Sequence, residues 1–504
     1  MTKAYMIIHD LKLGRAGLTN AMLTRSKVFY EKGLPADIIT FDDDPNYGDV
    51  VRELKNSGKM HQDTQLHNMI NFFKNRSMSS AEDQQPDFYQ NMHNQIHTCI
   101  EIEADSTSSR FFSKQTGEYV YFVRWTNAER TAYKHVDYFV KHKRESRFRF
   151  KKKKLDKIES FNEKNERYHE VFFNEKGNPF LNRAIHPEKQ TVEGNYLLYN
   201  KRKFVNNVEL AAFFIEELLD KYDETILICD GPGSFNKMLK SNPRNTMKIA
   251  VIHTNHFMHP YTYGSKVKKQ EAHIIENANN IDAIVVFTEK QKEDVKRQYN
   301  VSNIVVIPNF QYPAQIEKIT SKNERQVVGM ASRLHETKGF DRLIEVAEKV
   351  RTIDSTIKFH VYGKGGLEQS IRQAIDEKHL QQTVFLQGYS SNMNQVIGTF
   401  DISISTSKYE AFGLSISEAM MQEVPVVAMD VRYGPSDLIE DGYNGYLVED
   451  GDTSAMAQKI VELIHNQKQR TLFGKRGRQK VLEDLSIDKI YNKWNVLLQK
   501  KTTK

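Results

Sequence analysis

Short, almost wholly apolar runs alternate with helix-length segments in two separate parts of this chain. One series comprises residues 5–9, 36–41, 225–230, 249–253, 283–287 and 303–307. A second opens at 326–331 and continues at 357–362, 383–386, 402–405, 425–429 and 445–448. Strands that are buried on both faces and separated by helices form parallel, doubly wound sheets. The sequence therefore predicts two such sheets, with a polar linker at 317–325 and a final helix at 486–499.

The stretch from residue 76 to 213 has a different pattern. Short alternating runs lie at 99–103, 118–123, 147–150, 169–173 and 196–199, between polar turns. Helical periodicity is scarce there, and a period of two is typical of antiparallel strands. We therefore expect a β-rich antiparallel insertion in the first α/β unit. The domains are then 1–75 with 214–312, the insertion 76–213, a second unit 313–485 and a C-terminal helix 486–504.

Composition limits the class of protein. The chain has 504 residues, of which 39% are hydrophobic and 27% charged, and its formal net charge is +7. These values are typical of globular chains with more than one domain. Nothing resembles a leader or a run of about 18 apolar residues, and Cys99 and Cys229 form neither a disulfide framework nor a metal-binding motif. We expect a cytoplasmic protein with no metal.

Two cations follow the first strand of the second series. Arg333 and Lys338 lie in a loop that leads into a helix expected from Phe340. A planar guanidinium beside a compact ammonium suits two adjacent phosphates. Such cations stabilise the charge that grows on a departing nucleoside diphosphate without a metal. Two surface cations near the start of a helix are the simpler alternative.

Two glutamates flank a glycine turn further along. Glu410 and Glu418 are separated by seven residues, with Gly413 and an expected helix start at Leu414 between them. Backbone N–H groups at a helix start favour a pyrophosphate. Glu410 is then placed to accept hydrogen bonds from sugar hydroxyls, and Glu418 from a ribose. A single glutamate near a helix start is usually only a favourable partner of the helix dipole, but two glutamates at this spacing around a glycine turn are harder to explain in that way.

Arg333, Lys338 and Glu410-x₇-Glu418 together resemble the donor-site signature of the family-4 retaining glycosyltransferases, which have the GT-B fold. The segments 362–365 and 386–389 also resemble strand ends of that family. The resemblance implies two Rossmann-like domains facing a cleft, a UDP-sugar donor and no cofactor. It implies retention, with the leaving phosphate taking the acceptor's proton. The implied donor contacts are Gly17, Arg333, Lys338, Glu410, Ala411, Phe412, Gly413, Leu414 and Glu418.

The first α/β half offers further candidates. Gly17 lies in the loop after the first strand, where the resemblance places it near the diphosphate, although a plain turn is an equal alternative. His253 and His256 end a later strand, and in related enzymes a histidine here approaches the sugar. The sequence does not separate the two histidines. Catalytic roles are therefore expected for Arg333, Lys338, Glu410 and one of these two.

The acidic triplet 42–44 is a possible metal-binding motif of the other large glycosyltransferase fold. It follows the second strand and precedes a turn, so we interpret it as a loop. Because Arg333 and Lys338 supply the positive charge, we expect activity to survive EDTA.

More of the chain resembles a narrower group, the wall-teichoic-acid α-glycosyltransferases of Gram-positive bacteria (the TarM/TagE group). The matching stretches are 37–42, 230–235, 274–279, 433–437 and the β-rich insertion. This resemblance implies a homo-oligomer, a trimer in the best-known case, formed through the insertion. It also implies that glucose or N-acetylglucosamine is transferred from its UDP-sugar to poly(glycerol phosphate) or poly(ribitol phosphate). Glucose on poly(glycerol phosphate) is the first expectation.

The segment 141–157 is rich in lysine and arginine and holds only two acidic residues. Lys151, Lys152, Lys153 and Lys154 are our candidates for binding the polyanionic acceptor, and counter-ion release would weaken that binding with salt. A solvated basic loop is an equal alternative, and contact with the inner face of the cell membrane is a further expectation.

Three other functions remain open. An enzyme of this fold that puts N-acetylglucosamine on Ser/Thr-rich adhesins has a similar insertion. A non-catalytic partner subunit would not need the full set of Arg333, Lys338, Glu410 and Glu418. A nucleic-acid binder lacks support, since the sequence has no recognition motif of that kind.

Overall fold

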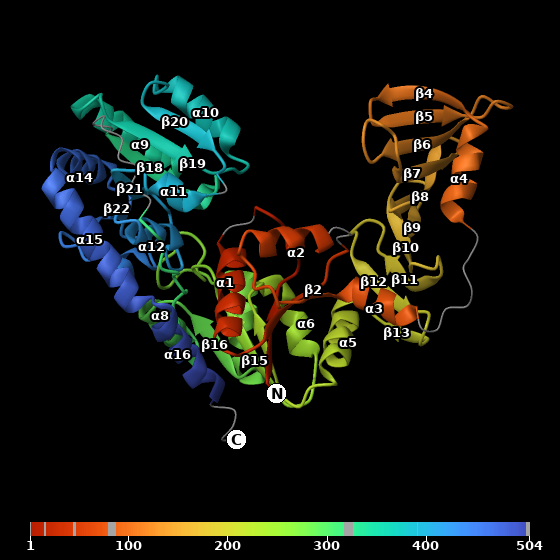
Figure 1. The fold of residues 1–504 in the computed structure, drawn as a ribbon, viewed down its shortest axis with the longest axis horizontal. Coiled ribbons are helices and arrows are strands. Elements are labelled where there is room, and N and C mark those ends of the chain that lie inside the picture. Colours follow the sequence, from red (N-terminus) through yellow and green to blue (C-terminus); the bar gives the residue numbers. More distant parts are fainter. Residues whose placement is uncertain are drawn as a thin grey trace.

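The computed structural model describes residues 2–14, 17–43, 47–78, 87–316, 326–390 and 392–499. These residues form two parallel β-sheets and one antiparallel sheet, and the antiparallel sheet projects to one side as an arm (Figure 1). The predicted linker at 317–325 lies outside the described residues. Within the described ranges no helix has the length and apolar character needed to cross a membrane.

The first parallel sheet has the strand order β17-β16-β15-β14-β1-β2-β3. Its strands are β1 (Lys3–Ile7), β2 (Ala36–Thr40), β3 (Leu66–Asn68), β14 (Thr225–Cys229), β15 (Thr246–Val251), β16 (Ala283–Val286) and β17 (Ile304–Val306). Its helices are α1 (Leu18–Glu31), α2 (Tyr47–Asn56), α3 (Met69–Ser77), α5 (Asn207–Leu219), α6 (Phe235–Lys240), α7 (Lys269–Glu276) and α8 (Glu289–Gln298). The chain runs outward in one direction from β1 and in the other from β14. These two neighbours therefore mark the switch point of the sheet.

The second parallel sheet has the order β20-β19-β18-β21-β22-β23. Its strands are β18 (Val327–Ala331), β19 (Lys358–Tyr362), β20 (Val384–Gly388), β21 (Ile402–Ser405), β22 (Val426–Met429) and β23 (Gly445–Val448). Its helices are α9 (Phe340–Ile353), α10 (Glu368–Glu377), α11 (Met393–Ile397), α12 (Leu414–Met421), α13 (Pro435–Leu438), α14 (Thr453–His465) and α15 (Gln467–Asp484). The switch point here lies between β18 and β21.

All twelve predicted strands of the two parallel sheets are confirmed. They are found because strands buried on both faces leave continuous apolar runs in the sequence. The short strand β3 was not predicted, since only Asn68 of its three residues is fully buried.

The last helix, α16 (Ile487–Gln499), confirms the predicted C-terminal helix and returns to the first half (Figure 1). Trp494 packs edge-on against Phe29 of α1, and the guanidinium of Arg25 lies 5.0 Å from its ring centroid. Lys32 also forms an ion pair with Asp488. The C-terminus therefore joins the two halves on the side of α1.

The antiparallel sheet is a ten-stranded meander ordered from β13 to β4. Its strands are β4 (Ile100–Asp105), β5 (Ser108–Phe112), β6 (Tyr119–Trp125), β7 (Tyr133–Val140), β8 (Lys143–Lys151), β9 (Lys154–Phe161), β10 (Arg167–Phe173), β11 (Pro179–Ile185), β12 (Val192–Leu197) and β13 (Arg202–Phe204). Its inner strands share a core with the first half, where Phe172 and Leu181 join Phe73 and Phe214. The outer strands pack on α4 (Phe88–His97) around a small core of their own.

Prediction of the insertion was incomplete. Five strands overlap the predicted runs, while β5, β7, β9, β11 and β13 were missed, and α4 was not expected. The basic stretch 141–157 is not a loop but parts of β8 and β9 with two tight turns. Both central residues of each turn, Lys141 with His142 and Lys152 with Lys153, have positive φ. Two-residue turns with positive φ usually contain Asn or Gly. Because these two turns contain Lys and His instead, the sequence did not indicate them.

Candidate active site

The predicted donor residues lie on loops at the carboxyl ends of two neighbouring strands. β18 pairs with β21 at the switch point of the second sheet. Arg333 and Lys338 follow β18, and Glu410 follows β21. Ligands of doubly wound sheets bind at such points because the flanking loops diverge there. Three residues that are up to 77 positions apart in the sequence therefore meet at one edge of one sheet.

Lys338 and Glu410 are in direct contact. The ammonium of Lys338 binds Oε1 of Glu410, and the Ser407 hydroxyl donates to the same oxygen over 2.7 Å. Both side chains are mostly buried, with 18% of Lys338 and 12% of Glu410 exposed. The pair places a fixed positive charge next to a fixed acceptor of hydrogen bonds. A negatively charged ligand bound here would be stabilised by the positive charge of Lys338. Hydroxyl groups of the same ligand could donate hydrogen bonds to Glu410.

The two loops that carry this pair are held together by backbone contacts. Lys408 N donates to Thr337 O over 2.8 Å, and the Thr406 hydroxyl donates to Lys338 O over 2.9 Å. Gly339 has φ of 64°, and a Cβ atom there would lie 2.0 Å from Thr406 O. Only glycine fits this approach, so it allows α9 to start directly behind Lys338.

Arg333 differs from Lys338 in having no partner. Its side chain is exposed, and within the described ranges it forms no ion pair or side-chain hydrogen bond. A guanidinium with its five donors free can bind two phosphate oxygens in parallel. Arg333 is therefore available to a ligand without first breaking a contact.

The segment after Glu410 leads into α12. Ala411 and Phe412 are buried, Gly413 precedes the helix, and half-buried Leu414 begins it, as expected from the sequence. Glu418 is half-buried one turn into α12. Burial raises the pKa of its carboxyl to about 7, and the nearby charge of Lys338 opposes that rise. Glu418 therefore changes charge near neutral pH.

The glycine loop of the first half approaches the second half. Gly17 has φ of 67°, immediately precedes α1, and nothing lies within 4 Å of where its Cβ would be. At Gly14 a Cβ would lie 3.2 Å from the ammonium of Lys364, which follows β19. The loop after β1 therefore faces the strand ends of the second sheet, with open space at Gly17. Residues 15 and 16 lie outside the described residues.

The two candidate histidines have different surroundings. Nε2 of His253 lies 2.7 Å from Oδ1 of Asp230, which also binds Arg25. These ionic partners hold the pKa of the buried Asp230 carboxyl below its usual value. His253 is thus part of an ion-paired cluster that joins α1 to the strand ends of β14 and β15.

His256 is fully buried and unpaired. Neither ring nitrogen has a hydrogen-bond partner in the described structure. Its ring stacks almost parallel to Tyr433 of the second half, with the centroids 6.0 Å apart. Burial lowers the pKa of His256 to about 4, so the imidazole is neutral near pH 7. A buried polar group without a partner is rare and costs stability.

Further contacts between the halves were not anticipated from the sequence. The rings of Tyr261 and Tyr409 lie 4.4 Å apart, and the ammonium of Lys268 lies 4.1 Å from the centre of the Tyr409 ring. Phe287 packs against Phe412 at 6.0 Å. These residues surround the segment that carries Glu410. The stretches 230–235 and 433–437 contribute to the resemblance, but the sequence assigns no roles to their residues.

The four candidate lysines for acceptor binding lie at the turn between β8 and β9. Lys152, Lys153 and Lys154 are exposed, while Lys151 is half-buried and its pKa is lowered by burial. Lys154 lies 3.9 Å from Glu175. This turn is therefore a basic surface at the C-terminal end of β8. The turn of Lys141 and His142 precedes the N-terminal end of the same strand.

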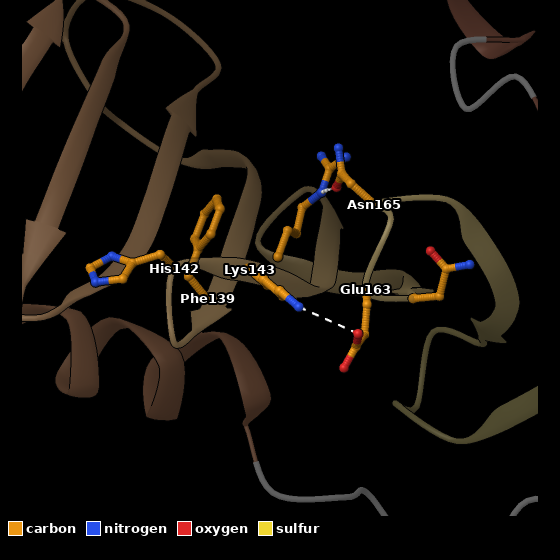
Figure 2. Close-up of a pocket in the computed structure, with 7 residues that line it drawn as sticks. Phe139, His142, Lys143, Glu163 and Asn165 are labelled. Carbon is orange, nitrogen blue, oxygen red and sulfur yellow. Dashed lines mark hydrogen bonds and ion pairs between the residues drawn. The ribbon is translucent and has the colours of Figure 1, made fainter.

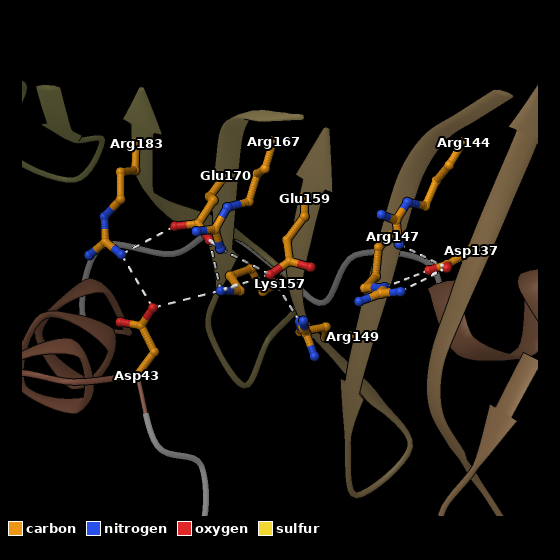
Figure 3. A network of polar contacts seen from close by, with 10 residues as sticks. All are labelled: Asp43, Asp137, Arg144, Arg147, Arg149, Lys157, Glu159, Arg167, Glu170 and Arg183. Carbon is orange, nitrogen blue, oxygen red and sulfur yellow. Dashed lines mark hydrogen bonds and ion pairs between the residues drawn. The ribbon is translucent and has the colours of Figure 1, made fainter. Parts of the chain in front are cut away.

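A row of charged side chains crosses the same sheet (Figure 3). Asp137, Arg147, Glu159, Glu170 and Arg183 are direct partners on the neighbouring strands β7 to β11, so they share one face. Lys157 lies 2.9 Å from Glu170 and 3.2 Å from Glu159. Arg144, Arg149 and Arg167 add further cations. The row contains more cations than acids. The side chains of Arg144, Arg147, Arg149 and Arg167 are partly exposed.

Two hollows lie along this sheet. One, of about 420 Å³, is lined by Phe139, His142, Lys143, Arg144, Asn162, Glu163 and Asn165 (Figure 2). The other, of about 360 Å³, includes Arg147, Arg149 and Arg167. Both hollows therefore have basic side chains in their walls.

The acidic triplet meets this row. Asp43 lies 3.3 Å from Arg183 and 3.6 Å from Lys157, and Tyr47 binds Asp42. Asp44 lies outside the described residues. In the part of the chain that the structure describes, no three His, Cys, Asp or Glu side chains are grouped to hold a metal ion. Asp43 instead connects the first half to the insertion.

Comparison with known proteins identifies relatives along the whole chain. Residues 311–480 match the family model of the group 1 glycosyl transferases. The chain is 39% identical to the poly(ribitol-phosphate) alpha-N-acetylglucosaminyltransferase of Staphylococcus aureus strain COL, over 98% of this chain and 99% of that protein. It is 25% identical to the poly(glycerol-phosphate) alpha-glucosyltransferase of Bacillus subtilis strain 168, over 94% of this chain and 71% of that protein.

Solved structures agree with this similarity. The crystal structure of the G117R mutant of S. aureus TarM in complex with fondaparinux, alpha-GlcNAc-glycerol and UDP matches this chain with a TM-score of 0.92 and 38% identity, over 99% of each chain. The pneumococcal O-GlcNAc transferase GtfA, at 20% identity, matches with a TM-score of 0.78, which indicates a shared fold. The predicted GT-B fold with its antiparallel insertion is confirmed.

Proposed function

Because the chain belongs to the group 1 glycosyl transferases, together with the staphylococcal enzyme, we propose that it transfers a sugar from a UDP-sugar to hydroxyl groups of a wall-teichoic-acid polymer. The observation that carries this proposal is the contact of Lys338 with Glu410, while Arg333, in the same loop as Lys338, has no side-chain partner among the described residues. That arrangement provides two cations for a diphosphate and one carboxylate for sugar hydroxyls. Similarity along nearly the full chain supports the acceptor class.

The reaction is proposed to proceed with retention. The bond between C1 of the sugar and the diphosphate oxygen breaks, and a bond from C1 to the acceptor oxygen forms on the same face. The acceptor's proton passes to the departing diphosphate, whose charge Arg333 and Lys338 stabilise. The products are UDP and the glycosylated polymer. Glu410 orients the sugar, and much of the rate comes from holding the acceptor hydroxyl next to C1 on the face from which the diphosphate leaves.

His256 is our candidate for the histidine at the sugar. His253 already contacts Asp230, whereas both nitrogens of His256 have no partner among the residues that the structure describes. A substrate hydroxyl would satisfy His256, and its neutral form can both donate and accept. The stack on Tyr433 places the ring where the two halves meet.

The identities to the two relatives also indicate which donor and acceptor to propose first. The relative at 39% identity uses N-acetylglucosamine and poly(ribitol phosphate) by its name, and the one at 25% uses glucose and poly(glycerol phosphate). We therefore place the first pair ahead of the second, the reverse of the order expected from the sequence. The acceptor is proposed to bind the insertion, where Lys151–Lys154 and the arginines of β8 and β10 supply positive charge.

A panel of substrates tests the function. The protein is incubated with UDP-glucose or UDP-N-acetylglucosamine and with poly(ribitol phosphate), poly(glycerol phosphate) or an adhesin repeat peptide, and UDP release and labelled polymer are measured. We expect transfer to a teichoic-acid polymer, no loss with EDTA, and an acceptor KM that rises steeply with salt. Exclusive labelling of the peptide would contradict the acceptor class. Loss of activity with EDTA would show that a metal is required.

Glu418 makes donor binding depend on pH. Its carboxylate can accept hydrogen bonds from both ribose hydroxyls only when ionised, and its pKa is about 7. Raising the pH from 6 to 8 should therefore tighten UDP-sugar binding by about tenfold, because protonation competes with binding below pH 7. A UDP-sugar is the suitable probe, since its diphosphate diester does not titrate in this range. Calorimetry of Glu418→Gln should show weaker binding without this pH dependence, and an equal dependence in the variant would refute the assignment.

A further inference from the structure

Asp294 of α8 makes a three-part contact across the two halves. Its Oδ2 accepts from Nε of Arg432 over 2.6 Å, and its Oδ1 accepts from Nη2 over 2.8 Å. The Tyr433 hydroxyl also donates to Oδ2 over 2.7 Å. Asp294 is only 1% exposed, and Tyr433 is equally buried. A buried carboxylate held by a two-point guanidinium contact is among the strong polar interactions in proteins.

The partners of Asp294 hold the main chain of Glu410. Glu410 N donates to Arg432 O over 3.4 Å, and Tyr433 N donates to Glu410 O over 3.1 Å. Arg432 and Tyr433 therefore bracket the residue proposed to orient the sugar. Their side chains point to the first half, while their backbones set the position of Glu410 in the second half.

The same helix supports the histidine loop of the first half. Gln291 of α8 donates to Thr254 O over 2.9 Å, and Asn255 donates to Arg432 O over 2.8 Å. His256, the next residue, stacks on Tyr433. Helix α8 thus contacts both the loop of His256 and the residues beside Glu410.

We propose that Asp294 is a positioning residue for sugar transfer, which aligns Glu410 with the first half by holding Arg432 and Tyr433. This inference rests on the proposed function and adds a residue that does not touch substrate. The Asp294 contact holds Arg432 and Tyr433 against the first half, and the backbones of these two residues hold Glu410. Without it, the donor still binds the second half, but Glu410 is no longer fixed relative to the acceptor side.

Kinetics of Asp294→Asn test this role, because asparagine keeps the size but removes the charge. We expect kcat for transfer to fall on the order of 10²-fold, since small misplacements at a reacting centre have effects of this size. Donor affinity measured by calorimetry should change by no more than about threefold, because most of the proposed donor contacts lie on the second half. Asp294→Glu, which retains the carboxylate, should recover at least about tenfold of the lost rate.

Tyr433→Phe is a milder second variant, which removes one hydrogen bond and keeps the stack on His256. Its kcat should fall roughly tenfold. Glu217→Gln is the matched control, since it removes an arginine–carboxylate pair with Arg76 inside the first half, and it should transfer at the wild-type rate. A folded Asp294→Asn with wild-type kcat overturns the inference, and so does a Tyr433→Phe with wild-type kcat if Asp294→Asn does not fold. If the wild type and Glu217→Gln also fail to transfer any sugar, the proposed function itself has failed.

Discussion

Replacing Lys338 with alanine should lower the rate of sugar transfer by about 10³-fold while the protein stays folded. Two effects add. The departing diphosphate loses a fixed cation, and the carboxylate of Glu410 is left without its partner in a mostly buried site. That uncompensated negative charge would repel the negative charge that grows on the leaving group. Initial rates of UDP release with saturating acceptor measure the change, and circular dichroism verifies the fold.

A lysine on the adjoining helix provides the control. Lys349 of α9 lies 2.9 Å from Glu345, and 36% of the lysine side chain and 52% of the glutamate side chain are exposed. Exposed pairs of this kind contribute little, so Lys349→Ala should change the rate by no more than about twofold. Glu410→Ala should match Lys338→Ala, because the sugar loses its acceptor of hydrogen bonds. Near-normal turnover in either active-site variant would refute the assignment of the donor site.

The substitution His256→Phe should lower the rate of sugar transfer without lowering the free energy of unfolding. Phenylalanine keeps an aromatic ring between Phe257 and Tyr433, and it removes two buried nitrogens that have no partners in the described structure. Because unsatisfied buried polar groups each cost about 1–3 kcal/mol, we expect an unchanged or higher free energy of unfolding. Transfer should nevertheless fall roughly 10- to 100-fold, the effect of losing a hydrogen bond to the substrate. Thermal melts and kcat/KM values measure the two quantities.

His135 offers a matched control for that change. It is a half-buried histidine of β7 whose Nδ1 also lacks a partner and whose pKa burial also lowers to about 4. It lies in the insertion, away from the junction of the two halves. His135→Phe should therefore leave kcat at saturating acceptor unchanged, although His135 is the strand partner of Arg149 in the proposed acceptor surface. If His256→Phe were as active as His135→Phe, its unpaired nitrogens would have no role in the reaction.

These expectations share one structural basis. The donor residues follow β18 and β21, and the histidines follow β15 in the other sheet. Each half brings its own groups to the carboxyl edge of its sheet. The reaction needs both edges, so the contacts that dock the halves become part of the active site. This is why a buried ion pair such as Asp294 with Arg432 is expected to affect turnover more than donor binding.

The parallel sheets and the donor motif were accessible from the sequence because their signals are local. Strands buried on both faces leave continuous apolar runs, and only seven residues separate Glu410 from Glu418. The insertion was harder to predict. Its turns at Lys141–His142 and Lys152–Lys153 lack the usual turn residues, so the ends of β8 were hidden in one basic stretch and the flanking strands β7 and β9 were missed.

The amino-acid sequence by itself determined which side chains follow each strand, and so which groups reach the edge of each sheet. The tertiary structure decided how those groups meet. It joined Lys338 to Glu410, tied His253 to Asp230 while leaving His256 unpaired, and placed Asp294 against Arg432, 138 positions away. Hydrophobic periodicity records only whether a residue is buried. Which distant residue it meets depends on how whole sheets and helices dock, and no local pattern contains that information.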